Sequence, residues 1–333
     1  MGAAMPAELD AAALARFDRD GFLLIAGALD PRDFDALKAE YEGVVDRAAA
    51  DLLARGAIAD AHPSLPFGER VAVLAEESDG ALHTYLDITL PQKGLSADLP
   101  PMSDGPAVFG LLTHPGLLDI AEAALGCGEL LSNPTQHIRV KPPASRLEGH
   151  SQIVGEMAQT VWHQDLGTVS AEADDTAMLT LWIPISPSTE ENGCLLVAPG
   201  SHRRGLVTHE RSQVANYSRS SSPQAIPDEL VGPERLPLPM MPGDVCLLHR
   251  ETMHASLPNL SDDIRWSVDI RYNPVGQATG RPWFPSFIAR SRSQPERELR
   301  SAAAWREMWC EARARLIAEP PDFSLFQRWP SSL

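Results

Sequence analysis

Several features that define other protein classes are scarce in this chain. It has four cysteines among 333 residues, and no two of them form a C-x-x-C spacing, which excludes a disulfide framework and a cysteine-rich zinc site. Acidic residues outnumber basic ones by 45 to 28, so the formal net charge is −17. An acidic chain of this kind is a poor partner for nucleic acid or for an anionic membrane surface.

Long apolar runs are also missing, because none reaches the ~18 residues that a membrane-spanning helix needs. The N-terminal segment lacks the basic region and the uninterrupted apolar core of a secretory signal. We therefore expect a cytoplasmic protein with reduced cysteines, a small molecule as its partner, and neither nucleic acid nor membrane as a partner. The sequence leaves the oligomeric state open.

The chain contains enough apolar residues, at 44%, to bury a large core. Before residue 135 its patterns favour helices more than strands. The elements expected there are a helix at 7–20, a strand at 22–25, a long helix from Asp30-Pro31, a strand-like run at 82–90 in an otherwise irregular 62–106, and a helix at 114–126. The long helix has an apolar face made of Phe34, Leu37, Tyr41, Val45 and Leu52.

After residue 135 the pattern changes to short β-like runs separated by turns. The runs are 136–141, 159–165, 177–185, 194–199, 244–249 and 265–272. In the last run, Arg265, Ser267, Asp269 and Arg271 share one face, whereas Trp266, Val268, Ile270 and Tyr272 share the other. Two long loops interrupt the pattern, one at 212–239 and one after the last run at 273–287, and a helix is expected at 294–317. This layout predicts an antiparallel sandwich or barrel with flanking helices.

We expect one domain over residues 1–333. It has a helical part at 1–134, a β core at 135–275, and a C-terminal loop and helix at 276–333. The fold class is therefore mainly β with flanking helices.

The stretch TVWHQDLGTV, residues 160–169, places His163 and Asp165 two apart in an apolar run. In a strand, residues two apart point to the same face. Burying either group without a partner is costly, so the two either form an ion pair or share a bound metal ion. His254 lies at the end of a later strand. Two histidines and one carboxylate form the facial triad of non-haem iron(II) oxygenases.

Several further stretches carry a family resemblance. They are FDRDGFLLIAGALD, HIRVKPP, HQDLG, LWIPISPSTEENGCLLVAPGSH, PGDVCLLH and HASLPNLSDDIRWSVDIRY. In these stretches the chain resembles the phytanoyl-CoA dioxygenase family of iron(II)- and 2-oxoglutarate-dependent oxygenases. The resemblance is strong over residues 136–272. It implies a double-stranded β-helix (a jelly-roll, cupin-like core) with iron at one open end.

The same resemblance implies an activity. The protein would be a dioxygenase that uses Fe(II), with 2-oxoglutarate and O2 as co-substrates. It would hydroxylate or otherwise oxidise a small organic metabolite and release succinate and CO2. A zinc-dependent cupin-like hydrolase or isomerase, or a catalytically inactive jelly roll that binds a small molecule, stays open as an alternative.

Individual residues match the family's functional positions. His163, Asp165 and His254 match the iron ligands, which are the catalytic residues. The remaining matches concern 2-oxoglutarate: Arg265 for its far carboxylate, Ser256 for a hydroxyl that bonds it, and Trp182 and His137 for positions that line it. A planar guanidinium suits a carboxylate because it binds bidentately and keeps its charge when buried. Alternatively, Arg265 pairs with Asp262, Asp263 or Asp269, and Trp182 is simply a core residue.

The organic substrate is predicted from charge. A CoA thioester brings several phosphate charges, and a chain at −17 repels it at long range unless a local basic patch offsets the repulsion. The segment 280–292 instead offers apolar rings beside basic side chains. We expect a free small molecule, with Arg281 or Arg290 holding a carboxylate and Trp283 providing apolar surface; alternatively, the rings pack against the C-terminal helix.

Overall fold

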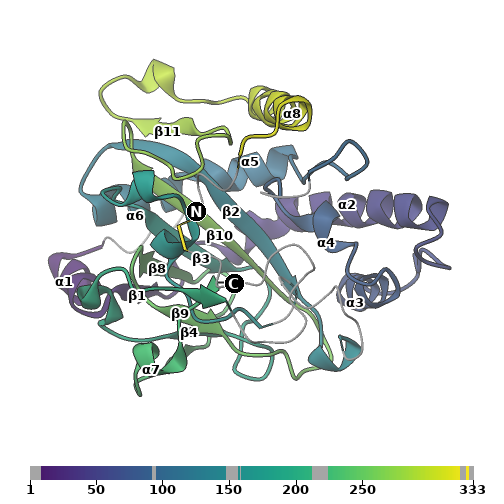
Figure 1. Ribbon diagram of the computed structural model, residues 1–333, viewed down its shortest axis with the longest axis horizontal. Helices are drawn as coiled ribbons and strands as arrows, with labels where there is room; N and C mark the ends of the chain where they lie inside the picture. Colours follow the sequence, from purple (N-terminus) through teal and green to yellow (C-terminus); the bar gives the residue numbers. More distant parts are fainter. Residues whose placement is uncertain are drawn as a thin grey trace, which may run out of the picture.

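The computed structural model describes residues 9–91, 95–147, 157, 159–211, 224–322 and 328–329. A six-stranded antiparallel sheet runs through its centre, in the order β1-β8-β3-β10-β2-β11 (Figure 1). Its strands are β1 (Phe22–Ile25), β2 (Glu129–Lys141), β3 (Leu179–Pro184), β8 (Val245–His249), β10 (Arg265–Pro274) and β11 (Phe287–Ser291). Because β1 and β11 come from the two ends of the chain, all three expected parts contribute to one sheet, and the expected boundary at 134/135 falls inside β2.

Two smaller sheets accompany the large one. The first has the order β7-β4-β9 and the second is a pair, β5-β6. Their strands are β4 (Leu195–Val197), β5 (Glu210–Arg211), β6 (Gln224–Ala225), β7 (Leu236–Leu238) and β9 (His254–Ser256). The expected loop at 212–239 therefore contains β6, β7 and a short helix in its described part. Residues 212–223 lie outside the described residues.

Helices make up at least as much of the described chain as strands, so the architecture is mixed and not mainly β. The α-helices are α1 (Ala11–Asp20), α2 (Asp35–Ala54), α3 (Phe67–Glu77), α4 (His83–Leu86), α5 (Pro106–Leu112), α6 (Pro115–Leu125), α7 (Asp228–Val231) and α8 (Ala302–Ala318). The 3₁₀ turns are η1 (Pro31–Phe34), η2 (Ala144–Arg146), η3 (Asp165–Thr168), η4 (Ala171–Ala173), η5 (Ser201–Arg204) and η6 (Pro295–Arg297).

The expected elements near the N-terminus are confirmed. Asp10 accepts a hydrogen bond from the backbone N–H of Ala13 and caps α1, and β1 follows. Pro31 begins the long helical segment made of η1 and α2. All five residues of its expected apolar face are buried, namely Phe34, Leu37, Tyr41, Val45 and Leu52. The helix expected at 114–126 is α6, which ends at Gly126 in the left-handed conformation.

The run at 82–90 contains the short helix α4, His83–Leu86, where we expected a strand, and α3 was not predicted. Leu82 and Leu86 are both buried and lie one helical turn apart, and Leu86 accepts a hydrogen bond from the Tyr41 hydroxyl at 2.7 Å. A short apolar run satisfies the helical and the strand period equally well, so its contact with α2 decides the conformation.

The C-terminal helix begins later than expected. Pro295 lies in η6, and α8 starts after Ser301, whose side chain accepts from the N–H of Ala304. The segment between β10 and this helix contains β11, which was not predicted and which begins at the last residue of the loop expected at 273–287. Trp305 and Trp309 of α8 are buried in the main core.

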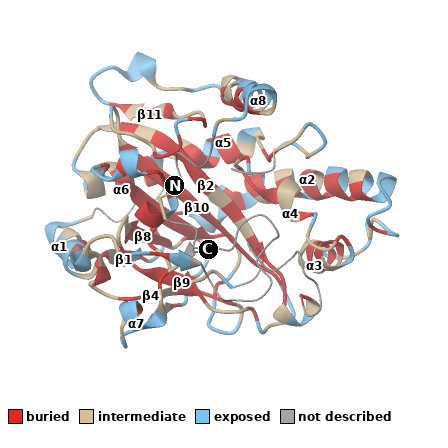
Figure 2. Cartoon of the chain, in the orientation of Figure 1, coloured by how far each residue is buried: buried red, intermediate tan, exposed pale blue. Residues whose placement is uncertain are grey.

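The two faces of the central sheet differ in character, as the alternation in β10 predicted. Trp266, Val268, Ile270 and Tyr272 belong to the main apolar cluster, together with residues of α2, α3, α5, α6 and α8. Figure 2 shows the buried residues concentrated in the central strands and on the inner sides of the helices. The opposite face carries Arg265, Ser267, Asp269 and Arg271, which are all buried as well. Polar groups buried on that face need partners, which makes it the place for a site.

Residues Pro106–Leu125 are long and apolar enough to resemble a membrane span by composition. In the structure they form two helices, α5 and α6, separated at Thr113 and His114. Both helices bury their apolar side chains in the main core. This explains their hydropathy without a membrane.

A glycine at the end of α1 lies next to the residues that support His254. Gly21 has φ +77°, and a Cβ there would lie 2.3 Å from Nδ1 of His202 and 2.5 Å from Oγ1 of Thr252. The carbonyl of Thr252 in turn accepts from Nδ1 of His254. The glycine therefore allows a close contact as well as a left-handed turn.

We expect Gly21→Ala to destabilise the fold more than Gly27→Ala. The left-handed conformation costs a non-glycine residue ~1–2 kcal/mol at either position. Gly27 has φ +60° but open space around it, so the overlaps arise only at Gly21. Urea unfolding of the two variants measures the difference, and equal losses of unfolding free energy would contradict the packing argument.

Candidate active site

His163 and Asp165 are brought together by a turn and not by a strand. His163 forms an isolated antiparallel bridge with His254, with both N–H···O=C distances at 3.0 Å. Asp165 already belongs to η3. The strand expected at 159–165 is therefore wrong. The chain bends after His163, and this bend directs the carboxylate of Asp165 back toward the two imidazoles.

Three potential ligand atoms converge at this point. Nε2 of His163 and Nε2 of His254 each lie 3.8 Å from Oδ1 of Asp165, and all three atoms lie within 4.8 Å of one another. In each imidazole, Nδ1 lies 2.9 Å from a backbone carbonyl, that of Val161 for His163 and that of Thr252 for His254. A donating Nδ1–H leaves the lone pair of Nε2 free, as a metal ligand requires.

The protonation states also suit a metal. Burial, followed by the neighbouring His254, lowers the pKa of His163 to about 3, so this imidazole is neutral at physiological pH. Burial opposes ionisation of Asp165, but the charge of Arg271 and the hydrogen bond that it donates hold the pKa of this carboxyl well below the usual range. Two imidazole nitrogens and one carboxylate form a donor set that fits iron(II).

Polar groups around Asp165 fix its orientation. Thr180 of β3 donates to Oδ2 at 2.5 Å, and Arg271 of β10 donates to Oδ1 at 2.5 Å. Arg271 also bonds Asp269 at 3.1 Å, and Asp269 accepts from Arg139 at 2.9 Å. Such outer groups commonly orient a ligating carboxylate. Arg271 was recognised in the sequence only by its face in β10, and Thr180 was missed because nothing in a single strand sets it apart.

The residues expected to bind 2-oxoglutarate lie on the same inner face. Arg265 is 1% exposed, and its Cζ lies 5.5 Å from the centroid of the Trp182 ring. Its Nη1 donates to Ser267 at 2.5 Å, and its Nε has no partner among the described residues. Burial, followed by the charge of Arg139, lowers the pKa of Arg265 to about 10. Within the described part of the chain, no ion pair joins Arg265 to Asp262, Asp263 or Asp269, and Asp269 instead bonds Arg139 and Arg271.

Lys141 is a second buried cation beside Arg265. It is 2% exposed and donates to Oγ of Ser256 at 2.7 Å and to the carbonyl of Leu257 at 2.5 Å. Burial, then the charges of Arg265 and Arg139, hold the pKa of Lys141 well below its usual range. Lys141 lies four positions after His137 in β2, and nothing in the sequence sets it apart, because solvated lysines show the same pattern.

Ser256 and His137 complete this region. Oγ of Ser256 accepts from Lys141 and, at 2.9 Å, from the N–H of Thr160, so its own hydroxyl hydrogen points elsewhere. His137 lies at the edge of the region, where Nδ1 is 3.0 Å from Oδ2 of Asp87. Asp87 follows α4, the helix that we had expected as a strand.

Of the three residues expected for the organic substrate, Arg281 lies nearest to the triad. It is 6% exposed and donates to the carbonyl of Thr168, in the same 3₁₀ turn as Asp165. Burial, followed by the charge of Arg271, lowers the pKa of Arg281 to about 9. Trp283 lies under its guanidinium, with Cζ 5.9 Å from the ring centroid, and also belongs to the main core.

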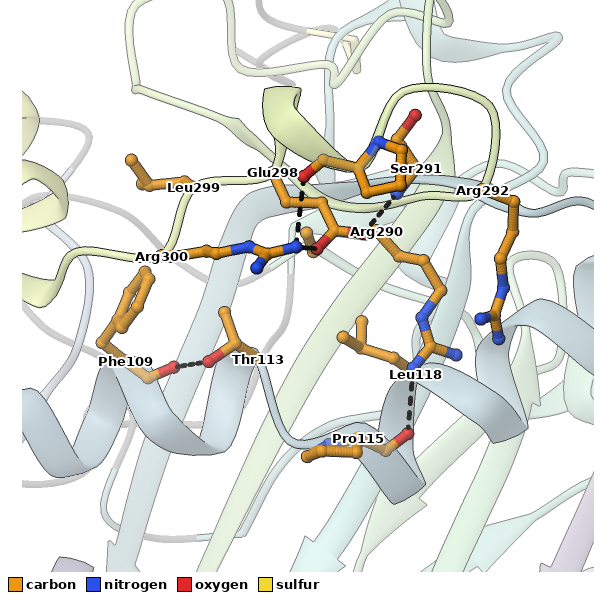
Figure 3. Close-up of a pocket in the computed structure, with 12 residues that line it drawn as sticks. Phe109, Thr113, Pro115, Leu118, Arg290, Ser291, Arg292, Glu298, Leu299 and Arg300 are labelled. Atoms are coloured by element: carbon orange, nitrogen blue, oxygen red, sulfur yellow. Dashed lines mark hydrogen bonds and ion pairs between the residues drawn. The ribbon is translucent and has the colours of Figure 1, made fainter.

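Arg290 is not brought to the triad. It lies on β11 and binds Asp119 at 2.5 Å and Glu122 at 3.0 Å, both on α6. It lines a cavity of about 600 Å³ between α5, α6 and the segment 289–300 (Figure 3), and no residue of the triad lines that cavity. The carboxylates that Arg290 binds in the structure are therefore side chains of this chain and not the carboxylate of a substrate.

Comparisons with known proteins identify the class. Residues 17–267 match the model of the family described as phytanoyl-CoA dioxygenase (PhyH). The 1-deoxypentalenic acid 11-beta-hydroxylase of Streptomyces arenae is 29% identical over 285 residues, which cover 82% of this chain and 86% of that protein. The ectoine dioxygenase of Sphingopyxis alaskensis is 25% identical over 296 residues, covering 84% and 83%.

A solved structure shows a similar fold. The apo form of the non-haem monooxygenase ThoJ superposes with a TM-score of 0.54 at 18% identity, and the match covers 92% of this chain and 98% of that one.

The site and these comparisons define a non-haem iron(II)- and 2-oxoglutarate-dependent dioxygenase. The chain belongs to the phytanoyl-CoA dioxygenase family. Fe(II) is its metal, and 2-oxoglutarate and O2 are its co-substrates. When bound, the metal supplies the oxidising power that protein side chains lack, and the protein supplies position and a dry pocket.

Proposed function

We propose that this enzyme hydroxylates, or otherwise oxidises, a free small organic acid and releases succinate and CO2. His163, Asp165 and His254 hold the iron. Arg265 binds the far carboxylate of 2-oxoglutarate, and Trp182, Ser256 and His137 line the same co-substrate. Arg281 binds the acid group of the organic substrate, with Trp283 beside it.

The buried cations support the co-substrate assignment. Lys141 and Arg265 lie together at the side of Trp182 and Ser256, and no carboxylate among the described residues forms an ion pair with either. Burying such charges is costly unless an anion joins them. A zinc hydrolase has no use for two buried cations beside its metal, and an inactive binding protein has no need of an intact ligand set. Both alternatives are therefore weaker.

An excess of positive charge supports an anionic organic substrate, and this is the observation that carries the proposal. Around the triad, Lys141, Arg265, Arg271 and Arg281 are buried and Arg139 is half-buried, against the buried carboxylates of Asp87, Asp165 and Asp269. Iron(II) and the dianion 2-oxoglutarate cancel each other, so at least one positive charge stays uncompensated even if Lys141 is neutral. The relative from Streptomyces arenae is named for an acid, which agrees with a carboxylate substrate.

The finer features of the fold and the setting are also proposals. The pairing of the central sheet with the smaller β7-β4-β9 sheet suits a double-stranded β-helix, with the inner polar face between them. We propose a single oxygenase domain over 1–333. The composition of the chain supports a cytoplasmic location with a small-molecule partner.

The test is to offer one organic acid both free and as its CoA thioester, and to measure succinate release. We expect faster release with the free acid, because the thioester adds phosphate charges to a protein at −17. Product mass then identifies the oxidation. Faster release with the thioester at physiological ionic strength would contradict the proposed substrate class.

A further inference from the structure

The segment that carries Asp165 has little regular structure of its own. Residues 165–174 form two short 3₁₀ turns, η3 and η4, separated by Val169 and Ser170. Turns of this length are weak, because each has only one or two hydrogen bonds. The position of Asp165 therefore depends on side chains from elsewhere in the chain.

Two residues near the C-terminus supply such side chains. Trp329 donates from Nε1 to the carbonyl of Gly167 at 2.8 Å, across 162 positions of sequence. Arg328 donates to the carbonyls of Val169 at 3.0 Å and Ser170 at 3.1 Å. Residues 328–329 appear as the short yellow segment near the centre of Figure 1.

Arg328 also forms an ion pair with Asp174, the residue that directly follows η4. Its side chain is only 8% exposed although that of Asp174 is 51% exposed. A guanidinium that satisfies two carbonyls and one carboxylate at once holds its acceptors in a fixed arrangement.

Trp329 reaches further toward the ligands through His209. The two rings stack with centroids 5.0 Å apart and an interplanar angle of 19°. His209 is 1% exposed, and its Nε2 accepts from the N–H of Gln164 at 3.0 Å. Gln164 lies between two of the metal ligands. His209 also packs so closely on Gly167 that a Cβ there would lie 2.3 Å from its ring.

We propose that Arg328 and Trp329 are positioning residues for the metal site. Their hydrogen bonds hold residues 165–170 in contact with His209. The carboxylate of Asp165 is then already placed beside the two imidazoles before the metal binds. Neither residue touches the metal. Trp329 acts through the backbone of η3, and Arg328 acts through Val169 and Ser170, which directly follow η3. The proposal rests on Asp165 being an iron ligand.

The experiment compares Trp329→Ala, Trp329→Phe and Arg328→Ala with wild type in the full-length chain. Anaerobic titration with Fe(II) in the presence of 2-oxoglutarate follows the weak visible charge-transfer band. Melting of the metal-free proteins reports stability separately. Arg313→Ala is the matched control, because Arg313 makes the same kind of contact, to the carbonyls of residues 96, 97 and 99, away from the site.

We expect Trp329→Ala and Arg328→Ala to raise the Fe(II) dissociation constant by ~10- to 100-fold, the range for groups that orient metal ligands. Trp329→Phe keeps the ring stack but loses the N–H, so it should lie between Trp329→Ala and wild type. Arg313→Ala should leave iron affinity unchanged even if it lowers the melting temperature.

Two outcomes would overturn this proposal but leave the ligand assignment intact. One is wild-type iron affinity in both Trp329→Ala and Arg328→Ala. The other is an equal loss of iron affinity in Arg313→Ala, which would show a general loss of stability. A wild-type protein that forms no iron complex would instead overturn the ligand assignment itself, and the proposal with it.

Discussion

Replacing His254 with alanine should abolish turnover and remove the charge-transfer band of the iron and 2-oxoglutarate complex. The variant loses one of two neutral nitrogen ligands, and only Asp165 and His163 remain to hold the metal. His254 lies at the start of β9, and alanine keeps its backbone bridge to His163. The fold should therefore survive while the metal centre is lost.

His249→Ala is the matched control for this variant. His249 lies at the end of β8, five residues before His254, and is half-buried beside His202, with ring centroids 5.1 Å apart. It belongs to no group of potential metal ligands among the described residues. Iron content, succinate formation and circular dichroism are measured for both variants. Full activity with stoichiometric iron in His254→Ala would show that the third ligand is misassigned.

The alternation of residues in β10 was enough to predict its two faces. A strand that places Arg265 and Asp269 on one side and Val268 and Ile270 on the other specifies which side meets the helices. The candidate ligands could be named because their spacing resembles that of a known family. The local conformation was still predicted wrongly, since a bend after His163, and not a strand, brings Asp165 to the imidazoles.

Other parts of the site left no signal in the sequence. Lys141 and Thr180 look like ordinary strand residues. Lys141 contacts Ser256, which lies 115 positions later in the chain, and Thr180 contacts Asp165, which lies 15 positions earlier. The contact of Trp329 with Gly167 is more distant still. Short amphipathic runs such as 82–90 fit two periods, so tertiary contacts decide between helix and strand.

Arg265→Ala should raise the Michaelis constant for 2-oxoglutarate far more than that for the organic substrate. Truncating one partner of a buried, hydrogen-bonded charge pair costs ~2–5 kcal/mol, which corresponds to roughly 30- to several-thousand-fold in affinity. Arg265→Lys keeps the charge but loses the planar fork, so it should recover only part of the loss.

Lys141→Met separates the contributions of the two cations. Methionine fills a similar volume without charge, and it leaves Ser256 with one hydrogen bond fewer. If both cations contact the co-substrate, the Michaelis constant for 2-oxoglutarate rises in this variant as well, by less than in Arg265→Ala, because a lysine offers a single point charge. Arg281→Ala is the counterpart on the other side of the site and should raise the Michaelis constant for the organic substrate instead.

An unchanged Michaelis constant for 2-oxoglutarate in Arg265→Ala would place 2-oxoglutarate elsewhere. If Lys141→Met changes only the Michaelis constant for the organic substrate, Lys141 binds that substrate and not 2-oxoglutarate. The surplus positive charge available to the organic substrate would then include Lys141.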